Sequence, residues 1–210
     1  MDENLIAALS AGNESARLNA ALKIGSYPDP ELADTLLARC AVEPDFYVRD
    51  MLTWALTRLP AAVTVPKLLT ELHSETAQAR SQALHTLSKI RDSRAWPAIT
   101  KSLLRDADDE VARSAWRAAV VLVPDRDRKA LARELATQFG RGEREMQLSL
   151  SRALVALGED AIASAIRKAR KSSDEIVRAH ADATVRLLRD PDAGFELSLD
   201  QAKRRYVLGK

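Results

Sequence analysis

The chain has 210 residues, of which 46% are apolar but only 4% are aromatic. Such a composition suits thin layers of helices better than a broad globular core or a sheet. Lys and Arg number 32 against 30 Asp and Glu, giving a formal charge of +2. A nucleic-acid binder that relies on phosphate neutralisation usually has a clear basic excess, which is missing here.

Cys40 is the only cysteine. A disulfide scaffold or a structural zinc site within a monomer is therefore excluded, and a reducing compartment is plausible. The acidic start of the chain lacks the basic and apolar regions of a signal peptide. No apolar run approaches the roughly 20 residues that span a bilayer. We expect a soluble, cytoplasmic protein of bacterial type that has no membrane partner.

A short helical signature recurs along the chain at intervals of 31 to 34 residues. Its polar anchor positions are Arg17, Arg49, Arg80, Arg113, Gln147 and Arg178. Four residues before the anchors stand Asn13, Asp45, Thr76, Asp109, Glu143 and Asp174. Asn, Asp and Thr side chains accept hydrogen bonds from the free N–H groups of a first helical turn. Each copy except that of Glu143 thus predicts a helix with a side-chain cap.

Four positions of each predicted helix, at −1, +3, +7 and +10 from the anchor, are apolar in every copy. They are Ala16, Ala20, Ile24, Tyr27; Val48, Leu52, Leu56, Leu59; Ala79, Ala83, Leu87, Ile90; Ala112, Trp116, Val120, Val123; Met146, Leu150, Leu154, Leu157; and Val177, Ala181, Val185, Leu188. Spacings of three and four place each set on one helical face.

Another amphipathic helix is expected before each of these. Its stripes, in chain order, are Leu5, Ile6, Leu9; Leu32, Leu36, Leu37, Cys40; Val65, Leu68, Leu69, Leu72; Trp96, Ile99, Leu103; Leu131, Leu135, Phe139; and Ile162, Ile166, Ala169. We place Pro66 and Pro97 in the first turns of two such helices, where the missing N–H costs little. The sequence shows no strand pattern.

The predicted fold is all-α: an α-solenoid, or α-α superhelix, of about six antiparallel helix pairs. A fixed period of this length is typical of units that bury their apolar faces only by stacking. The expected repeats span residues 2–28, 29–61, 62–92, 93–124, 125–158 and 159–191. Residues 192–210 form a tail that we interpret as a cap on the last repeat, with docking elsewhere as the alternative.

Two segments, Asp45–Arg49 and Asp174–Arg178, combine an Asp near the helix start with Val-Arg. With the Ala and Leu that follow, they resemble the HEAT-repeat family, and most closely the short bacterial repeats first described in phycobilin lyases. The resemblance covers roughly residues 3 to 190 and implies an α-solenoid scaffold. It does not define an activity, because one such scaffold hosts many functions.

The anchor arginines have two interpretations. They could form an anion-binding row, or they could bond capping carboxylates of their own or the adjacent repeat. We favour this structural ladder, since repeats depend on their neighbour interfaces, and the family resemblance implies the same role. Gln147 departs from the pattern.

The second helices of HEAT-like solenoids line the concave side, so we expect the residues opposite the apolar stripe to lie there. This face mixes small and apolar residues, such as Leu84, Ala118, Leu148 and Ala183, with a few larger candidates for partner binding. These candidates are Asp50, Trp54, His85, Arg117 and Arg152. Exposed apolar groups with Trp and Arg are typical of protein interfaces. Alternatively, Trp54 and Leu84 pack against adjacent helices.

No catalytic residue, cofactor site or metal site is predicted. His73, His85 and His180 lack metal-ligand spacing, and their structural interpretation is favoured. The protein is therefore interpreted as a non-catalytic scaffold or adaptor whose concave face binds a protein or peptide. The alternative is a nucleic-acid-binding or base-repair protein of the HEAT-like glycosylase kind, using Asp50, Trp54, Arg117 and Arg152. An enzyme acting on a small molecule near His85 is a third possibility.

Overall fold

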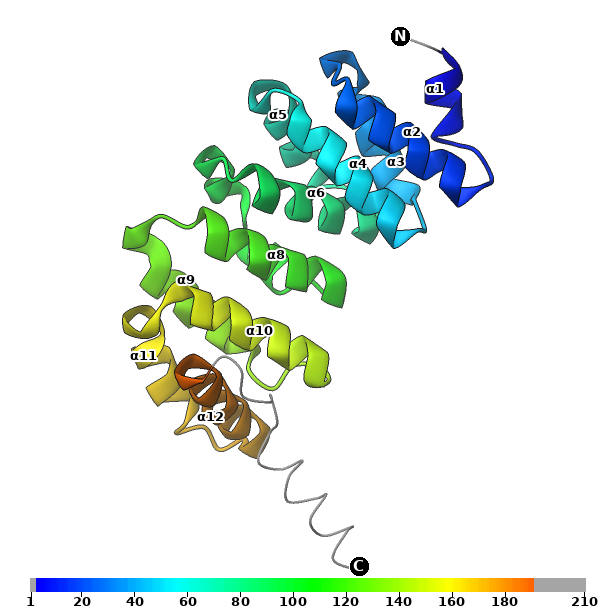
Figure 1. Ribbon diagram of the computed structural model, residues 1–210. Coiled ribbons are helices and arrows are strands. Elements are labelled where there is room, and N and C mark those ends of the chain that lie inside the picture. The colour runs from blue at the N-terminus through cyan, green and yellow to red at the C-terminus, as the bar shows by residue number, and fades with distance from the viewer. Residues whose placement is uncertain (1–2, 191–210) are drawn as a thin grey trace, which may run out of the picture. The chain divides into compact units, whose positions relative to one another are not determined.

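The computed structural model describes residues 3–190 and contains only helices and their connections in that range (Figure 1). The predicted tail, residues 192–210, lies outside the described residues. The chain divides into two compact units, residues 1–122 and 123–210. None of the helices between residues 3 and 190 has the length and hydropathy needed to cross a membrane. The prediction of an all-α, solenoid-type fold is confirmed.

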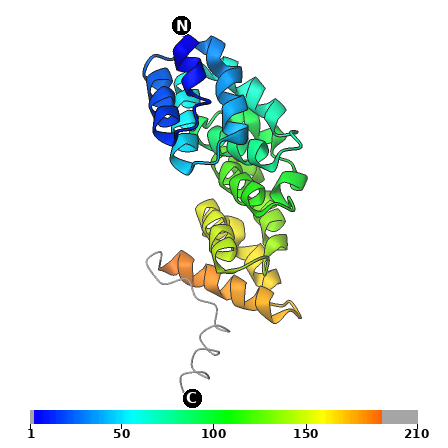
Figure 2. The same cartoon turned by 90° about the vertical axis from the view of Figure 1, so that its right-hand side faces the viewer.

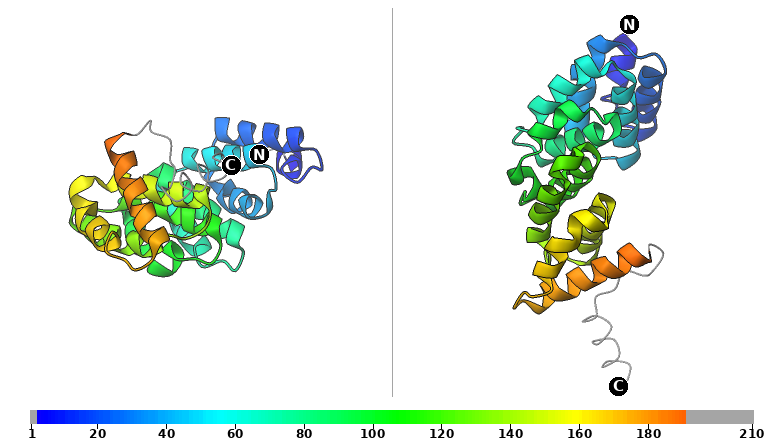
Figure 3. Two further views of the ribbon diagram at one scale, coloured as in Figure 1. Left: turned by 90° about the horizontal axis from the view of Figure 1, so that it is seen from below. Right: turned by 90° about the vertical axis from the view of Figure 1, so that its left-hand side faces the viewer.

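The first unit consists of consecutive helix pairs joined by short connections. Its elements are α1 (Glu3–Ala8), α2 (Glu14–Ser26), the 3₁₀ turn η1 (Pro30–Leu32), α3 (Ala33–Val42), α4 (Phe46–Arg58), α5 (Ala61–Glu71), α6 (Ala77–Ile90), η2 (Ser93–Ala98), α7 (Lys101–Leu104) and α8 (Asp109–Leu122). The second helices pack side by side, α2 on α4, α4 on α6 and α6 on α8. The first helices α3 and α5 form the other layer, and Figures 2 and 3 show the helices from other directions.

The second unit continues the same construction. Its elements are η3 (Asp125–Asp127), α9 (Arg128–Leu135), η4 (Ala136–Gln138), α10 (Arg144–Leu157), α11 (Glu159–Ala169) and α12 (Glu175–Arg189). Helices α9 and α11 pack together, as do α10 and α12. The repeat boundaries expected from the sequence stay a prediction.

The core lies between the two helical layers of each unit and is built from the recurrent apolar stripe. Leu56, Leu87 and Leu154 occupy the same stripe position in three repeats, and none of them is accessible to solvent. Burying a leucine side chain contributes about 2 kcal/mol. The stripe therefore supplies the stacking energy that the periodicity predicts.

Tyr27 is the clear exception in the stripe, because its side chain is 81% exposed. Helix α2 ends at Ser26, and the backbone of Tyr27 is no longer helical. A period of 3.6 residues predicts a side chain's direction only inside a helix. The prediction of a buried Tyr27 is wrong for this reason.

The prolines of two first helices lie deeper than expected. Helix α5 begins at Ala61, so Pro66 stands in its second turn rather than its first. The expected helix around Pro97 is instead split into the 3₁₀ segment η2 and the single turn α7. A proline inside a helix lacks an N–H and clashes with the preceding turn, which accounts for this interruption.

Candidate functional site

Three of the four second helices of the first unit, α2, α4 and α8, begin at side-chain caps. The Asn13 and Asp45 side chains accept backbone N–H groups of the first turn, as predicted. Thr76 makes no such side-chain bond. Helix α8 is capped by Asp108, which accepts the N–H groups of Glu110 and Val111, and not by the expected Asp109.

The different cap shifts the register of α8 by one residue. The anchors of the other helices donate their backbone N–H to the cap residue's carbonyl, and in α8 this donor is Ala112 rather than Arg113. Every position of α8 that is counted from the anchor therefore moves one residue towards the N-terminus. Arg117 then takes the position, five residues after the anchor, that Trp54 and His85 occupy in α4 and α6. The sequence-based register of this repeat was wrong.

Two anchor arginines, Arg17 and Arg80, bind a carboxylate of the adjacent repeat, as the ladder interpretation predicts, although that carboxylate is not the N-cap side chain. Nη1 of Arg49 donates to the carbonyls of Glu43 and Pro44, at 2.9 and 2.7 Å. Nη1 of Arg178 likewise donates to two carbonyls of the preceding loop. Each arginine thus ties the start of its helix to the connection before it. The capping side chains themselves are not the acceptors.

Glu43 connects the first two repeats and was missed by the sequence analysis. Its carboxylate is fully buried and accepts bonds from Arg17, Arg39 and the N–H of Asp45. Burial alone would raise the pKa of Glu43, but these hydrogen bonds hold it at about 2. A charged side chain inside the stack is therefore fully compensated. Its position two residues before a helix cap was the available signal.

Much of the expected apolar groove is closed by neighbouring helices. Leu84 and Ala118 are inaccessible to solvent, and Ser114 is buried. In the second unit, Leu148 and Ala183 belong to one buried cluster. The second helices lie so close together that small residues serve as packing surfaces between them. The packing alternative is confirmed for Leu84, and the prediction of an apolar groove is wrong at these positions.

Trp54 is half-buried and lies against Gly25 of α2. A Cβ atom added to Gly25 would approach the ring to 2.2 Å. Only glycine allows the indole to occupy this place, so Trp54 fills the space between two second helices. The ring lines neither of the two pockets formed by residues of α4, α6 and α8.

A pocket of about 370 Å³ lies on the face formed by α4, α6 and α8, which we call the second-helix face. It is lined by Phe46, Arg49, Asp50, Ser81, Gln82, His85, Glu110, Arg113, Ser114 and Arg117. The structure therefore brings together three of the predicted residues, Asp50, His85 and Arg117. Arg152 belongs to the second unit, where it is exposed on α10.

The pocket contains charges of both signs. Nε2 of His85 lies 4.0 Å from Oδ1 of Asp50, which is beyond hydrogen-bond distance. Burial and the positive charges of Lys89 and Arg117 lower the pKa of His85, while Asp50 opposes them. Loss of solvation, together with Arg113, lowers the pKa of Arg117. His85 is thus neutral at pH 7 and presents hydrogen-bonding groups rather than a charge.

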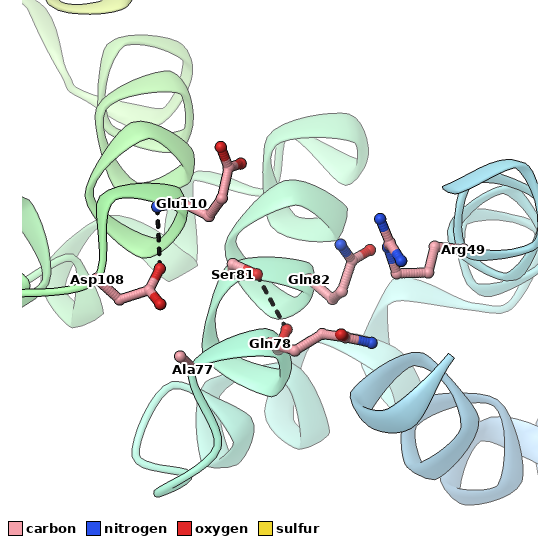
Figure 4. Close-up of a pocket in the computed structure, with 7 residues that line it drawn as sticks. All are labelled: Arg49, Ala77, Gln78, Ser81, Gln82, Asp108 and Glu110. Atoms are coloured by element: carbon pink, nitrogen blue, oxygen red, sulfur yellow. Dashed lines mark hydrogen bonds between the residues drawn. The ribbon is translucent and has the colours of Figure 1, made fainter. Parts of the chain in front are cut away.

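Two pocket features were missed by the sequence analysis. Phe46 lines the pocket while being 64% exposed. It stands three residues before its anchor, where the equivalent residues of the first and third copies are Glu14 and Ala77. An aromatic residue at this position was the available signal. The second feature is an adjoining pocket of about 290 Å³ around Arg49 and Gln82 (Figure 4).

Other reactive groups of the described residues lie in structural settings. Burial raises the pKa of the Cys40 thiol to about 12, so it is not a nucleophile at neutral pH. His180 is buried in the second unit and hydrogen-bonded through both ring nitrogens. Between residues 3 and 190, no three His, Cys, Asp or Glu side chains gather as metal ligands would.

Residues 42–120 match the family model of HEAT repeats. These residues are HEAT repeats. The resemblance seen in the sequence is thereby confirmed for residues 42–120, which contain α4, α6, most of α8 and the residues that line both pockets of the second-helix face. No curated protein matches the chain.

Several solved structures are similar to this chain. An engineered protein of the Northeast Structural Genomics Consortium is 20% identical, over 90% of this chain and 97% of that one, with a TM-score of 0.48. The complex of CpcE and CpcF of phycocyanin lyase from Nostoc sp. PCC7120 is 19% identical, over 88% and 75%, with a TM-score of 0.49. A designed armadillo repeat protein is 16% identical, over 88% and 98%, with a TM-score of 0.45.

Proposed function

We propose that this protein is a non-catalytic HEAT-repeat scaffold that binds a protein partner through the second-helix face of its first unit. Stacked helical repeats present an extended surface, and binding to that surface is how such solenoids commonly act. The pocket between α4, α6 and α8 is a hollow in this surface, and both apolar and polar side chains line it.

The observation that carries this proposal is that one pocket is lined by both Phe46, from α4, and Arg117, from α8. A phenyl ring that is 64% exposed gains free energy when a partner covers it. Aromatic and arginine side chains are also enriched at the interface positions that dominate binding energy. Phe46 supplies apolar area, while Arg117 and His85 supply hydrogen bonds that orient a partner.

The alternatives have no comparable observation in their favour. An acid–base pair would be supported by a hydrogen bond between His85 and Asp50, but their side chains are 4.0 Å apart and form none. A nucleic-acid site requires a continuous basic surface. In this pocket Asp50 and Glu110 interrupt the arginines.

A peptide-display library selected against the whole protein tests the proposal. Enriched peptides should bind the unaltered protein and lose at least tenfold in affinity when Phe46→Ala and Arg117→Ala are combined. Isothermal calorimetry measures the affinity, and circular dichroism establishes that the helices are intact.

The matched control replaces Tyr27 by Ala. Tyr27 is even more exposed than Phe46 but is absent from the pocket lining, so its loss should leave affinity unchanged. If the library yields no binders, or if the binders tolerate the double substitution, the assignment of this face is wrong.

A further inference from the structure

Two repeats of the first unit contain a complete carboxylate-binding arrangement. In the first, Nη1 of Arg17 donates to the carbonyls of Ala11 and Gly12, which fixes the guanidinium. Its other edge, Nε and Nη2, donates to the two carboxylate oxygens of Glu43 at 2.8 and 2.9 Å. This is the bidentate geometry that arginine and carboxylate groups favour.

The third repeat contains the same arrangement. Nη1 of Arg80 donates to the carbonyls of Ser74 and Glu75, while Nε and Nη2 donate to Asp106 at 3.1 and 3.2 Å. Glu43 and Asp106 also share a second kind of hydrogen bond. Each accepts the backbone N–H of the residue two positions further along, just before the next second helix.

Arg49, in the repeat between them, has half of this arrangement. Its Nη1 is fixed by two loop carbonyls, as in Arg17 and Arg80. Its Nε and Nη2 have no hydrogen-bond or ion-pair partner among the described residues. The guanidinium is thus held in place with its bidentate edge open.

The reason for the open edge is a substitution at one equivalent position. Ser74 occupies the place of Glu43 and Asp106, as its Oγ accepts the N–H of Thr76 two residues further along. A serine hydroxyl is too short to reach the arginine and carries no charge. The carboxylate that completes the ladder in the neighbouring repeats is therefore missing beside Arg49.

The open edge lies at a pocket. Arg49 lines both pockets of the second-helix face and projects from α4 towards Gln82 of α6 (Figure 4). The Gln82 side chain has no hydrogen-bond partner among the described residues, so its amide is available beside the guanidinium. Both groups are half-buried, which strengthens a charge-assisted bond relative to one in open water.

The two acidic residues of the smaller pocket, which Figure 4 shows, are already engaged. Asp108 caps α8, and Glu110 pairs with Arg113 at 2.8 Å. Both lie on the far side of the pocket from Arg49 in Figure 4. They therefore leave the open guanidinium edge to a group from outside.

We propose that Arg49 is a carboxylate receptor, and that a carboxylate of the bound partner takes the place that Glu43 and Asp106 occupy in the neighbouring repeats. The ligand class is thus an acidic peptide, which binds through an Asp or Glu side chain or through a chain terminus. Identifying the carboxylate as the partner's rests on the proposed function. The receptor itself does not, since any small carboxylate can test it.

The test follows the arginine Nε–H signals of the whole, ¹⁵N-labelled protein by nuclear magnetic resonance. The probes are N-acetyl-glutamate N-methylamide, which carries a side-chain carboxylate, and N-acetyl-glycylglycine, which carries a terminal one. The Arg49 signal, assigned by its loss in Arg49→Lys, should shift saturably with at least one probe. N-acetyl-glutamine N-methylamide, which has no carboxylate, should leave it in place.

Arg17 and Arg80 are internal controls, because their edges are occupied and their signals should not move. Ser74→Glu supplies an internal carboxylate and should abolish the shift, whereas Ser74→Gln should preserve it. A response of Arg49 no larger than that of exposed Arg133 and Arg167 overturns the proposal. So does an undiminished response in a folded Ser74→Glu protein.

The two proposals can fail separately. Probe binding at Arg49 without any library-selected peptide would retain the receptor and remove the scaffold assignment. Selected peptides whose affinity is unchanged by Glu→Gln or Asp→Asn replacement and by C-terminal amidation would do the reverse. In that case the partner binds the face without using Arg49.

Discussion

The indole ring of Trp54 covers Gly25, leaving no room for a side chain at residue 25. An ideal Cβ atom there would lie 2.2 Å from Cζ3 and 2.4 Å from Cε3 of the ring. Helices α2 and α4 therefore approach through a glycine on one side and the largest side chain on the other. This contact is part of the stacking energy that holds the first two repeats together.

Gly25→Ala should destabilise the first unit, although alanine is the better helix former. The added methyl group forces the indole to move, and overpacking of this kind costs about 1 to 3 kcal/mol. Urea denaturation followed by tryptophan fluorescence measures the effect, because Trp54, Trp96 and Trp116 all belong to this unit.

Gly12→Ala is the matched control. A Cβ at Gly12 meets no atom within 4 Å, so this variant should unfold at nearly the same urea concentration as the unaltered protein. Combining Gly25→Ala with Trp54→Leu should recover part of the loss. Equal midpoints for the two glycine variants would contradict the tight contact between the helices.

Glu43→Gln should be among the most damaging single substitutions in the first unit. It leaves the Arg17 guanidinium, which is buried, without its counter-ion, and such unpaired charges cost about 3 kcal/mol or more. Equilibrium denaturation gives the magnitude. Asp34→Asn is the control, since its ion pair with Lys67 is exposed and should contribute less than about 1 kcal/mol.

The same carboxylate predicts an acid sensitivity. The pKa of Glu43 is lowered from 4.5 to about 2, so the unfolded chain binds a proton more readily than the folded protein does. Its contribution to stability is complete above pH 4.5 and is lost as the pH falls towards 2. The pH dependence of the unfolding free energy in this window should be weaker in Glu43→Gln.

The fold could be predicted from the sequence because its determinants are local and repeated. Leu56, Leu87 and Leu154 recur at one offset, and all three are fully buried. What periodicity could not give was the exact register of α8, which depends on whether Asp108 or Asp109 caps the helix. Two adjacent aspartates satisfy the same local rule, and only the packing of α8 decides between them.

The site was less predictable because it depends on the distance between neighbouring helices. Offsets from an anchor place both Leu84 and His85 away from the apolar stripe, yet one is inaccessible and the other lines a pocket. The distances between α4, α6 and α8 set this difference, and those distances depend on tertiary packing rather than on local sequence. The open edge of Arg49 likewise becomes visible only beside the filled edges of Arg17 and Arg80.

His180 should make the second unit sensitive to mild acid. Nδ1 accepts the N–H of Gly140 at 3.0 Å, so Nε2 carries the proton and faces the carbonyl of Gln147 at 2.9 Å. Burial lowers the pKa of His180 from 6.5 to about 4, although the hydrogen bond to the backbone of Gln147 raises it. Protonation of Nδ1 would break the bond from Gly140.

The direction in which stability changes with pH follows from this lowered pKa. Between pH 6.5 and 4 the unfolded chain binds the proton that the folded protein excludes, so stability falls by about 3 kcal/mol as the pH falls through this window. Hydrogen exchange of α10 and α12 measures the loss. His180→Gln should remove most of the dependence, and a His180 resonance titrating near 6.5 would contradict the buried neutral ring.

Ser74→Glu should stabilise the first unit by completing its ladder. The new carboxylate can accept the N–H of Thr76 as Ser74 does and reach the open edge of Arg49, as Glu43 reaches Arg17. A half-buried bidentate pair of this kind contributes about 1 kcal/mol or slightly more. Urea denaturation should show a higher midpoint than for Ser74→Gln, which has the same length but no charge. The gain should also shrink when Arg49 is replaced by Lys, because a lysine cannot offer two parallel donors. A Ser74→Glu protein no more stable than Ser74→Gln would mean that the edge of Arg49 is not placed to receive a carboxylate.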